Sequence, residues 1–299
     1  MRKYSVRPAR LSDLDAVYAI LAAQNNFDFG SPLMTLDDLK KSWTSIDLED
    51  DTCIAFADGQ LAGYGELFEN DSPFVYLTDR KNVDLAFQLL TILEDKALSR
   101  KKESVNLFAR VSAKNNTLSQ LFASKGYKSN LAFYIMEINL SAPPAQPEWP
   151  IDITVRTFVR NQDEQATYQT DEEASEDKGY HDPMSYEDWV KRMRMEKDSF
   201  DPGLWFLAYE QTEMVGVALN LINKDTNQGW VDHLGVRAPW RKRGLGKALL
   251  LHSFGEFYRR GIKTIKLSVD SKSLTGAPRL YKNVGLQTIQ EYFIYRKEI

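Results

Sequence analysis

The sequence predicts a mixed α/β fold that occurs twice in tandem. Its 299 residues are enough for about two domains of roughly 150 residues, each with its own hydrophobic core. A proline-rich segment, residues 141–150, holds four of the 11 prolines and can continue neither a helix nor a central strand. Similar sequence patterns recur on both sides of this segment. We therefore expect one domain over residues 1–140, an extended linker over 141–150 and a second domain over 151–299.

The repeat is visible in three pairs of short patterns. In order, these are Val6-Arg7 and Val155-Arg156, residues 57–63 and 210–216, and Leu121-Phe122 and Leu280-Tyr281. The first pair leads into helical patterns, the second reads as strand, turn, strand, and the third precedes a glycine and a closing strand. Each half is thus expected to contain a first strand, one or two helices, a hairpin, two strand–helix pairs and a last strand. That order of elements predicts a mixed sheet.

Composition and charge exclude several classes of protein. Apolar residues make up 43% and charged residues 27% of the chain, which is typical of a globular protein and not of a disordered or fibrous one. The 42 acidic and 38 basic side chains leave a net charge of −4, so the average surface would not attract a polyanion. Any phosphate binding must therefore come from a local basic patch.

Cysteine, histidine and hydropathy limit the remaining possibilities. A single cysteine, Cys53, excludes an intrachain disulfide and a metal site built from cysteines, and the three histidines show no metal-ligand spacing. We expect no metal. The start of the chain lacks a signal-peptide pattern and no run approaches 18 apolar residues, which favours a cytoplasmic protein without a membrane partner.

A glycine-rich basic loop follows a strand in the second half. Residues 230–236 read as a strand, and residues 241–247 (Arg-Lys-Arg-Gly-Leu-Gly-Lys) open a helix expected over 245–260. Unpaired N–H groups at a helix start bind anions, and glycines let a ligand approach the backbone closely. The dinucleotide fingerprint fails here because its last glycine is absent, and the Walker pattern fails because Ala248 cannot ligate magnesium.

A third pattern, [R/Q]-x-x-G-x-[G/A] after a strand that ends in valine, fits at Arg241, Gly244 and Gly246. Here the chain resembles the GNAT superfamily of acyl-CoA-dependent N-acyltransferases, and its arrangement is similar to the tandem two-domain members. The resemblance is strong over residues 150–299 and weak over 1–140. It implies two GNAT-like domains, with acetyl-CoA as co-substrate.

The resemblance also assigns roles to individual residues. The backbone of Leu234, Gly235 and Val236 would bind the pantetheine arm, and Tyr281 would stand near the thioester sulfur as general acid. Further cofactor contacts are implied beside the adenosine and pantetheine for Ala277 and Arg279. The pyrophosphate would be held by Arg241, Lys242, Arg243, Gly244, Leu245, Gly246 and Lys247.

The general base is not settled by the sequence. The family's usual carboxylate position on the strand is occupied by Trp230, which cannot accept a proton. Asp232 lies two residues further on the same face of a regular strand, whereas His233 points to the other face but has a side chain that titrates near neutral pH. Either residue could instead be structural, and a bound water could serve without a dedicated base. The family's asparagine, seven positions before the tyrosine, is replaced by Leu274.

The first half lacks both the glycine loop and the candidate acid. Residues 81–87 contain no glycine where the loop should be, and Phe122 stands in place of the tyrosine. Two independent losses predict that the first domain does not catalyse acyl transfer.

These observations predict an N-acetyltransferase that moves acetyl from acetyl-CoA to a primary amine of a small molecule or peptide, as a monomer or homodimer. A non-catalytic acyl-CoA sensor or scaffold is the alternative. Nucleic-acid binding through residues 241–243 is disfavoured by the acidic chain. The acidic run from Asp171 to Tyr180 could attract a cationic amine or simply form a solvated helix face.

Overall fold

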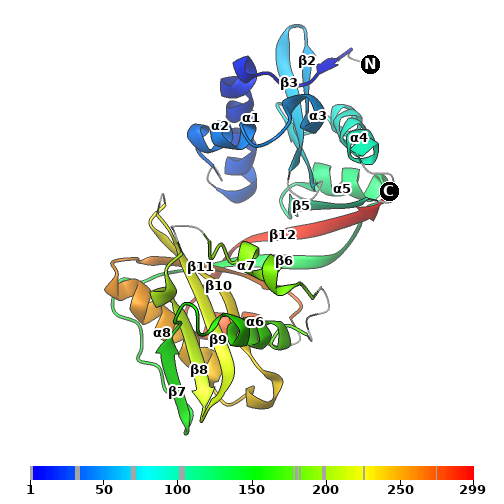
Figure 1. The fold of residues 1–299 in the computed structure, drawn as a ribbon. Coiled ribbons are helices and arrows are strands. Elements are labelled where there is room, and N and C mark those ends of the chain that lie inside the picture. The colour runs from blue at the N-terminus through cyan, green and yellow to red at the C-terminus, as the bar shows by residue number, and fades with distance from the viewer. Residues whose placement is uncertain are drawn as a thin grey trace. The chain divides into compact units, whose positions relative to one another are not determined.

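The computed structural model describes residues 3–30, 34–68, 72–100, 105–176, 178, 181, 183–196, 200–224, 226–273 and 275–299. The chain folds into two compact units, Met1–Phe133 with Gln290–Ile299 as unit 1 and Tyr134–Ile289 as unit 2. Helices and strands occur in both units (Figure 1), which confirms the mixed α/β fold. These units differ from the expected ranges 1–140, 141–150 and 151–299, because residues 134–150 belong to unit 2 and residues 290–299 to unit 1.

Unit 1 contains a four-stranded antiparallel sheet in the order β1-β2-β3-β4. Strand β5 of this unit lies outside that four-stranded sheet. It pairs antiparallel with β12 (Gln287–Glu298), with Tyr292 opposite Ser112. The elements before β12 are β1 (Ser5–Arg7), α1 (Leu14–Phe29), α2 (Leu36–Trp43), α3 (Leu48–Asp51), β2 (Thr52–Ala57), β3 (Gln60–Phe68), β4 (Ser72–Leu77), α4 (Val83–Arg100), β5 (Asn106–Ser112), α5 (Asn116–Ser124) and the start of β6 (Lys128–Asn139). The core of the unit includes Leu89 and Leu93 of α4, both fully buried.

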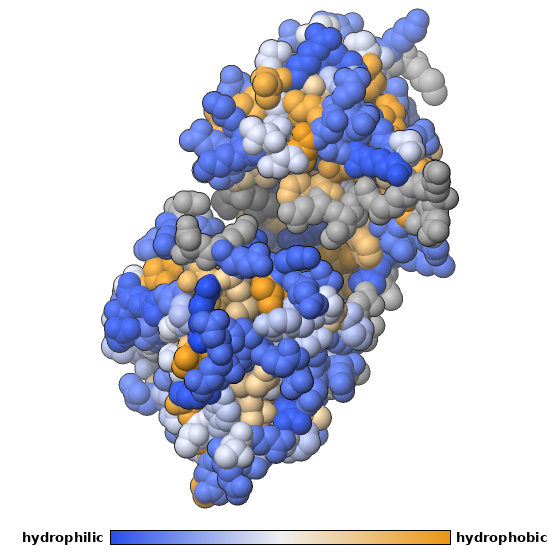
Figure 2. Space-filling view, viewed as in Figure 1, coloured by the Kyte–Doolittle hydropathy of each residue, from blue (hydrophilic) through white to orange (hydrophobic). Residues whose placement is uncertain are grey.

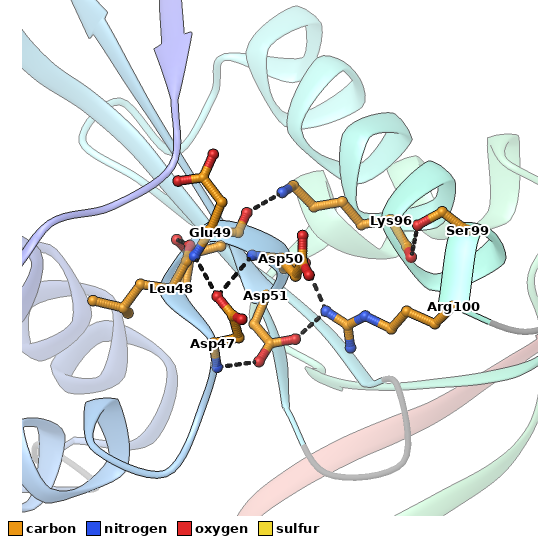
Figure 3. A network of polar contacts seen from close by, with 9 residues as sticks. Asp47, Leu48, Glu49, Asp50, Asp51, Lys96, Ser99 and Arg100 are labelled. Carbon is orange, nitrogen blue, oxygen red and sulfur yellow. Dashed lines mark hydrogen bonds and ion pairs between the residues drawn. The ribbon is translucent and has the colours of Figure 1, made fainter.

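A polar network holds α4 against the short helix α3 (Figure 3). The Asp47 carboxylate caps α3 by accepting the backbone N–H groups of Glu49 and Asp50. From α4, Lys96 and Arg100 donate to the backbone oxygens of those same two residues. The network therefore satisfies backbone groups at both ends of a helix that is too short to satisfy them itself.

The described residues of unit 2 form six strands in the order β6-β11-β10-β9-β8-β7. Strands β7 to β10 are antiparallel, whereas β10 and β11 are parallel. Its elements after β6 are β7 (Ile153–Thr157), α6 (Glu164–Glu173), α7 (Tyr186–Arg192), β8 (Trp205–Glu210), β9 (Glu213–Asn223), β10 (Gln228–Val236), α8 (Leu245–Arg259), β11 (Thr264–Asp270) and α9 (Ala277–Asn283). Residues 141–150 form neither helix nor strand.

The sheet of unit 2 is covered on both faces (Figure 1). Leu207, Val217 and Leu219 pack with Trp189 of α7 on one face. The alternating neighbours Phe206, Ala208 and Ala218 pack on the other face with Leu245 and Leu249 of α8. Side chains alternate between the faces of a strand, so each position on β8 to β10 is assigned to the α6–α7 face or to the α8 face.

The duplication is visible in one repeated ion pair. Arg7 donates two hydrogen bonds to Asp13 at 2.7 and 2.8 Å, and Arg156 does the same to Asp163 at 2.6 and 2.7 Å. Arg7 lies on β1 and Arg156 on β7, and in each case the aspartate immediately precedes the α-helix that follows the strand. The correspondence confirms that the strand-to-helix entry occurs once in each half.

The face of the molecule drawn in Figure 2 is mainly hydrophilic, with apolar side chains in small separate areas. Among the helices of the described residues, none is long and apolar enough to cross a bilayer. Within the same residues, no cluster of three or more histidine, cysteine, aspartate or glutamate side chains is arranged to hold a metal ion.

Candidate active site

The parallel pairing of β10 with β11 ends about halfway along the two strands. Their parallel pairing runs from Gln228 opposite Thr264 to Val231 opposite Leu267 and ends there among the described residues. Beyond that point β10 continues for five residues while it remains paired with β9. Among the described residues, the end of β10 is therefore paired with β9 on one edge and unpaired with β11 on the other.

The register shows which backbone groups lie on this edge. The Arg237 N–H donates to the Val215 oxygen at 3.0 Å, and hydrogen-bonded pairs alternate along an antiparallel ladder. Gly235 therefore bonds toward β9, whereas Leu234 and Val236 direct their N–H and C=O groups toward the β11 side. The Val236 oxygen accepts a bond from Arg241 Nε at 2.9 Å. This is the edge at which the sequence predicts pantetheine binding.

The two candidate bases occupy very different places. The β10–β9 register shifts between Val231 and His233, so Asp232 is the extra residue of a β-bulge and its side chain is exposed. The bulge interrupts the alternation on which the expected orientation of Asp232 was based. His233, by contrast, is opposite Leu219, which places its side chain on the α6–α7 face.

His233 forms a short pair with a buried carboxylate of α6. Its Nδ1 lies 2.8 Å from Oδ2 of Asp171 and 3.0 Å from Oδ1. The Trp189 Nε1–H of α7 donates to Asp171 Oδ2 at 3.0 Å. Burial alone disfavours the Asp171 carboxylate, but the charge and hydrogen bond of His233 and the bond from Trp189 outweigh it and hold the pKa of Asp171 below its ordinary value.

Sequence reasoning placed Asp171 in an acidic run and missed this pair. A signal was present: Thr167, Thr170, Asp171 and Ala174 have the i, i+3, i+4, i+7 spacing of one helix face, and all four are buried. An aspartate on a face otherwise made of small residues needs a partner in the interior.

Two further carboxylates of the acidic run have side-chain partners. Glu172 lies 3.2 Å from His181, and Glu173 accepts a bond from Arg237 at 2.5 Å. Asp177, Gly179 and Tyr180 lie outside the described residues. Attraction of a cationic acceptor by this run stays a prediction.

The glycine loop forms the start of α8. Gly244 has a φ of 89° and Lys242 a φ of 61°, so the backbone turns sharply just before the helix. The first intrahelical bond runs from the Ala248 N–H to the Gly244 oxygen, and the N–H groups ahead of it have no acceptor in the helix. The side chains of Lys242 and Lys247 are partly or fully exposed beside them, whereas Leu245 is buried and could contribute only its backbone.

The two arginines of the loop have protein partners. Arg241 donates to the backbone oxygens of Val236 and Ala174, so its side chain fixes the loop to the end of β10 and to α6. Arg243 forms an ion pair with Glu210 at 2.7 Å. Contacts of Arg241 and Arg243 with a pyrophosphate stay predictions. Because the Arg241 side chain holds the loop, its effect on a pyrophosphate would be exerted through the conformation of the loop.

Helix α9 brings Tyr281 to the same end of the sheet. Tyr281 is 7% exposed and belongs to the core cluster on the α8 face, against which Leu234 and Ala277 also pack. A Cβ added to Gly246 would lie 3.6 Å from Leu280 and 3.8 Å from Val236, which shows that the loop faces both α9 and the end of β10. Arg279 is exposed, and Leu274 lies outside the described residues.

Unit 1 offers a contrasting arrangement at the equivalent place. The Asn82 side chain accepts the Leu85 N–H at 3.1 Å, so a side chain already caps the start of α4. Phe122 is buried and packs its ring at 4.9 Å from that of Tyr127. That unit 1 lacks acyl-transfer chemistry stays a prediction.

Comparison with known proteins points to one family. The model described as the acetyltransferase (GNAT) family matches residues 162–286. Curated relatives named mycothiol acetyltransferase include one from Thermobispora bispora, 30% identical over 60% of this chain and 61% of its own length. Another, from Kytococcus sedentarius, is 26% identical over 78% of this chain and 77% of its own length. Several further curated relatives are matched over only about half of their length, 49% for that of Streptomyces scabiei.

Solved structures extend the similarity to the whole chain. A GCN5-related N-acetyltransferase from Sphaerobacter thermophilus is 33% identical, with a TM-score of 0.83, and the match covers 99% of this chain and 95% of that one. A tandem GNAT protein from the clavulanic acid biosynthesis pathway has a TM-score of 0.67 at 13% identity over 99% of this chain and 98% of its own. The latter similarity shows the fold alone.

Proposed function

Because the chain belongs to the GNAT acetyltransferase family, we propose that it transfers an acetyl group from acetyl-CoA to a primary amine. The observation that carries the proposal lies in unit 2, where the edge of β10 that is no longer paired with β11 leads into the start of α8, whose first N–H groups have no acceptor in the helix. Amide groups bind such an edge, and phosphates bind such a helix start. Pantetheine and pyrophosphate are joined in one molecule, acetyl-CoA.

Each part of acetyl-CoA has suitable partners. The pantetheine amides would bond to the backbone of Leu234 and Val236. The pyrophosphate would lie on the first-turn N–H groups of α8, with Lys242 and Lys247 contributing positive charge. Positioning the thioester in this way lowers the barrier by holding both reactants in reach of each other.

The reaction moves one proton from nitrogen to sulfur. The neutral amine attacks the thioester carbon, the N–C bond forms and the C–S bond breaks. His233 would take the proton from the amine, and the Tyr281 hydroxyl would protonate the departing thiolate. Solvent then returns the proton from the imidazolium to the phenolate, so that both groups are restored.

His233 is favoured over Asp232 as the base because of its surroundings. The Asp232 carboxylate is exposed at a bulge, whereas His233 is held by Asp171 on the α6–α7 face. A fixed imidazole can accept a proton at one defined atom, whereas a carboxylate has two equivalent oxygens. The acceptor amine would accordingly enter from the α6–α7 face.

A small molecule is the proposed acceptor, as the name of the mycothiol acetyltransferase relatives suggests. The test is incubation of the whole chain with acetyl-CoA and a panel of small primary amines, with acetylated product and free CoA measured by mass spectrometry. Equal amounts of both products are expected for at least one amine. Binding of acetyl-CoA without transfer to any amine would support a sensor or scaffold instead, and no binding at all would contradict the proposal.

A further inference from the structure

The pair formed by Asp171 and His233 suggests a role for the aspartate that rests on the proposed function. We propose that Asp171 is a positioning residue that keeps the proton of neutral His233 on Nδ1, so that Nε2 is free to take the proton of the acceptor amine. A carboxylate accepts hydrogen bonds and cannot donate them, so a bond to Nδ1 requires the hydrogen on that nitrogen.

The carboxylate is itself held in place. Trp189, whose side chain is fully buried, donates its indole N–H to Oδ2, and Asp171 has a side chain only 4% exposed. With indole on one side and imidazole on the other, the carboxylate plane has little freedom to turn. Two other charged groups near the pair, among the described residues, are Lys178, which acts on Asp171, and Asp232, the exposed neighbour of His233.

The backbone of β10 allows this approach. A Cβ at Gly235 would lie 2.8 Å from the Ala174 Cβ and 3.8 Å from Asp171 Oδ1, so α6 comes this close only because residue 235 is glycine. His233 and Gly235 face α6, whereas Leu234 and Tyr281 belong to the α8 face. The base and the acid thus reach the thioester from opposite faces of the sheet.

The tautomer can be measured directly by ¹⁵N NMR of imidazole-labelled protein at alkaline pH. We expect neutral His233 with its hydrogen on Nδ1. In Asp171→Asn we expect a mixture or the Nε2–H form, and a kcat lower by about 10²-fold or more with unchanged acetyl-CoA affinity. The matched control is Glu172→Gln on the same helix, which should leave both the tautomer and kcat as they are.

An Nε2–H tautomer in the unaltered protein would overturn the inference without any variant having to fold, as would an Asp171→Asn protein with normal kcat. Failure of the unaltered protein to bind acetyl-CoA would instead contradict the proposed function, because that result does not depend on the tautomer.

A second inference comes independently from unit 1. The Thr78 N–H donates to the Ala62 oxygen at 3.0 Å, as the Arg237 N–H does to Val215. By that correspondence, Val75 and Leu77 of β4 are the counterparts of Leu234 and Val236 of β10. Their outward backbone groups form the edge at which unit 1 would receive a pantetheine arm.

The side chain of Gln24 already occupies this edge. Its Nε2 donates to the Val75 oxygen at 3.1 Å, and its Oε1 accepts the Leu77 N–H at 3.3 Å. Gln24 is 6% exposed, so the carboxamide is enclosed. We infer that Gln24 closes unit 1 to acyl-CoA by taking the place of a pantetheine amide. The helix position equivalent to Gln24, counted from Asp13 and Asp163, is Ala174, which has no side-chain amide to offer.

Equilibrium binding and amide exchange test the closure, again on the premise that unit 2 binds acetyl-CoA. We expect one acetyl-CoA per chain in calorimetry, and amide exchange at Leu77 that is slow with or without acetyl-CoA. Gln24→Ala should speed exchange at Leu77. The control is Gln88→Ala on the exposed surface of α4, which should leave that exchange unchanged. Two molecules bound per unaltered chain would overturn the inference, and none would contradict the proposed function.

Discussion

Gly235 of β10 lies directly beneath Ala174 at the end of α6, at a distance that leaves no room for a methyl group between them. We therefore expect Gly235→Ala to push α6 away from β10, to cost about 1–3 kcal/mol of unfolding free energy and to lower kcat by separating Asp171 from His233. Denaturant unfolding and steady-state kinetics measure the two effects. A variant as stable and as active as the original protein would show that the helix can shift freely.

The control for that substitution is Gly255→Ala in α8. Nothing lies within 4 Å of a Cβ at that position, and its φ is not positive. Alanine in a helix interior is expected to raise the unfolding free energy by about 0.5–1 kcal/mol and to leave kcat unchanged.

Tyr281→Phe tests the general acid. The ring is buried, so phenylalanine should preserve its packing while it removes the hydroxyl. A decrease in kcat of about 10²–10⁴-fold is expected, with acetyl-CoA affinity retained. Stopped-time product assays and calorimetry give the two values, and Tyr258→Phe in α8 is the control expected to keep full activity. An unchanged kcat in Tyr281→Phe would rule out its role as acid.

Gly246→Ala separates ligand binding from stability. The added Cβ would meet Leu280 and Val236 only at ordinary contact distances, so the fold should tolerate it. If phosphates approach the backbone of this first turn, the methyl group should weaken acetyl-CoA binding by about tenfold, or ~1.4 kcal/mol. Gly229→Ala should have the opposite effect, because its Cβ would lie 2.8 Å from the Phe257 ring. We expect it to lower Tm and to leave the acetyl-CoA affinity of the folded protein nearly unchanged. Equal affinity in Gly246→Ala and the original protein would contradict a phosphate site there.

The thiol of Cys53 should report the unfolding of unit 1. Burial raises the pKa of Cys53 to about 12, so the thiolate, which is the reactive form, is scarce below that pH while the unit is folded. An unfolded chain returns the thiol to its ordinary pKa of about 8.5. Labelling by an aromatic disulfide near pH ~8 should thus be slow in buffer and fast in denaturant, because only the unfolded thiol ionises appreciably there. Rapid labelling of the folded protein would show that β2 opens readily.

Local patterns were enough to predict several parts of the molecule. The helix expected over 245–260 is observed as Leu245–Arg259, and the loop with Gly244 at its positive φ precedes it. Tyr281 lies on a helix as expected. Periodicity, glycine and proline act over a few residues of chain, and for this reason their consequences can be read without the fold.

The sequence by itself determined the duplicated α/β pattern, the glycine loop and the aromatic helix that follows it. The tertiary structure decided that Asp171 meets His233, 62 positions away, that Arg241 supports the loop through Val236 and Ala174, and that Gln24 covers the edge of β4. It also decided that residues 134–140 belong to unit 2 and residues 290–299 to unit 1. Both closing strands carry similar aromatic patterns, so only packing against a particular sheet and core selects the partner of each.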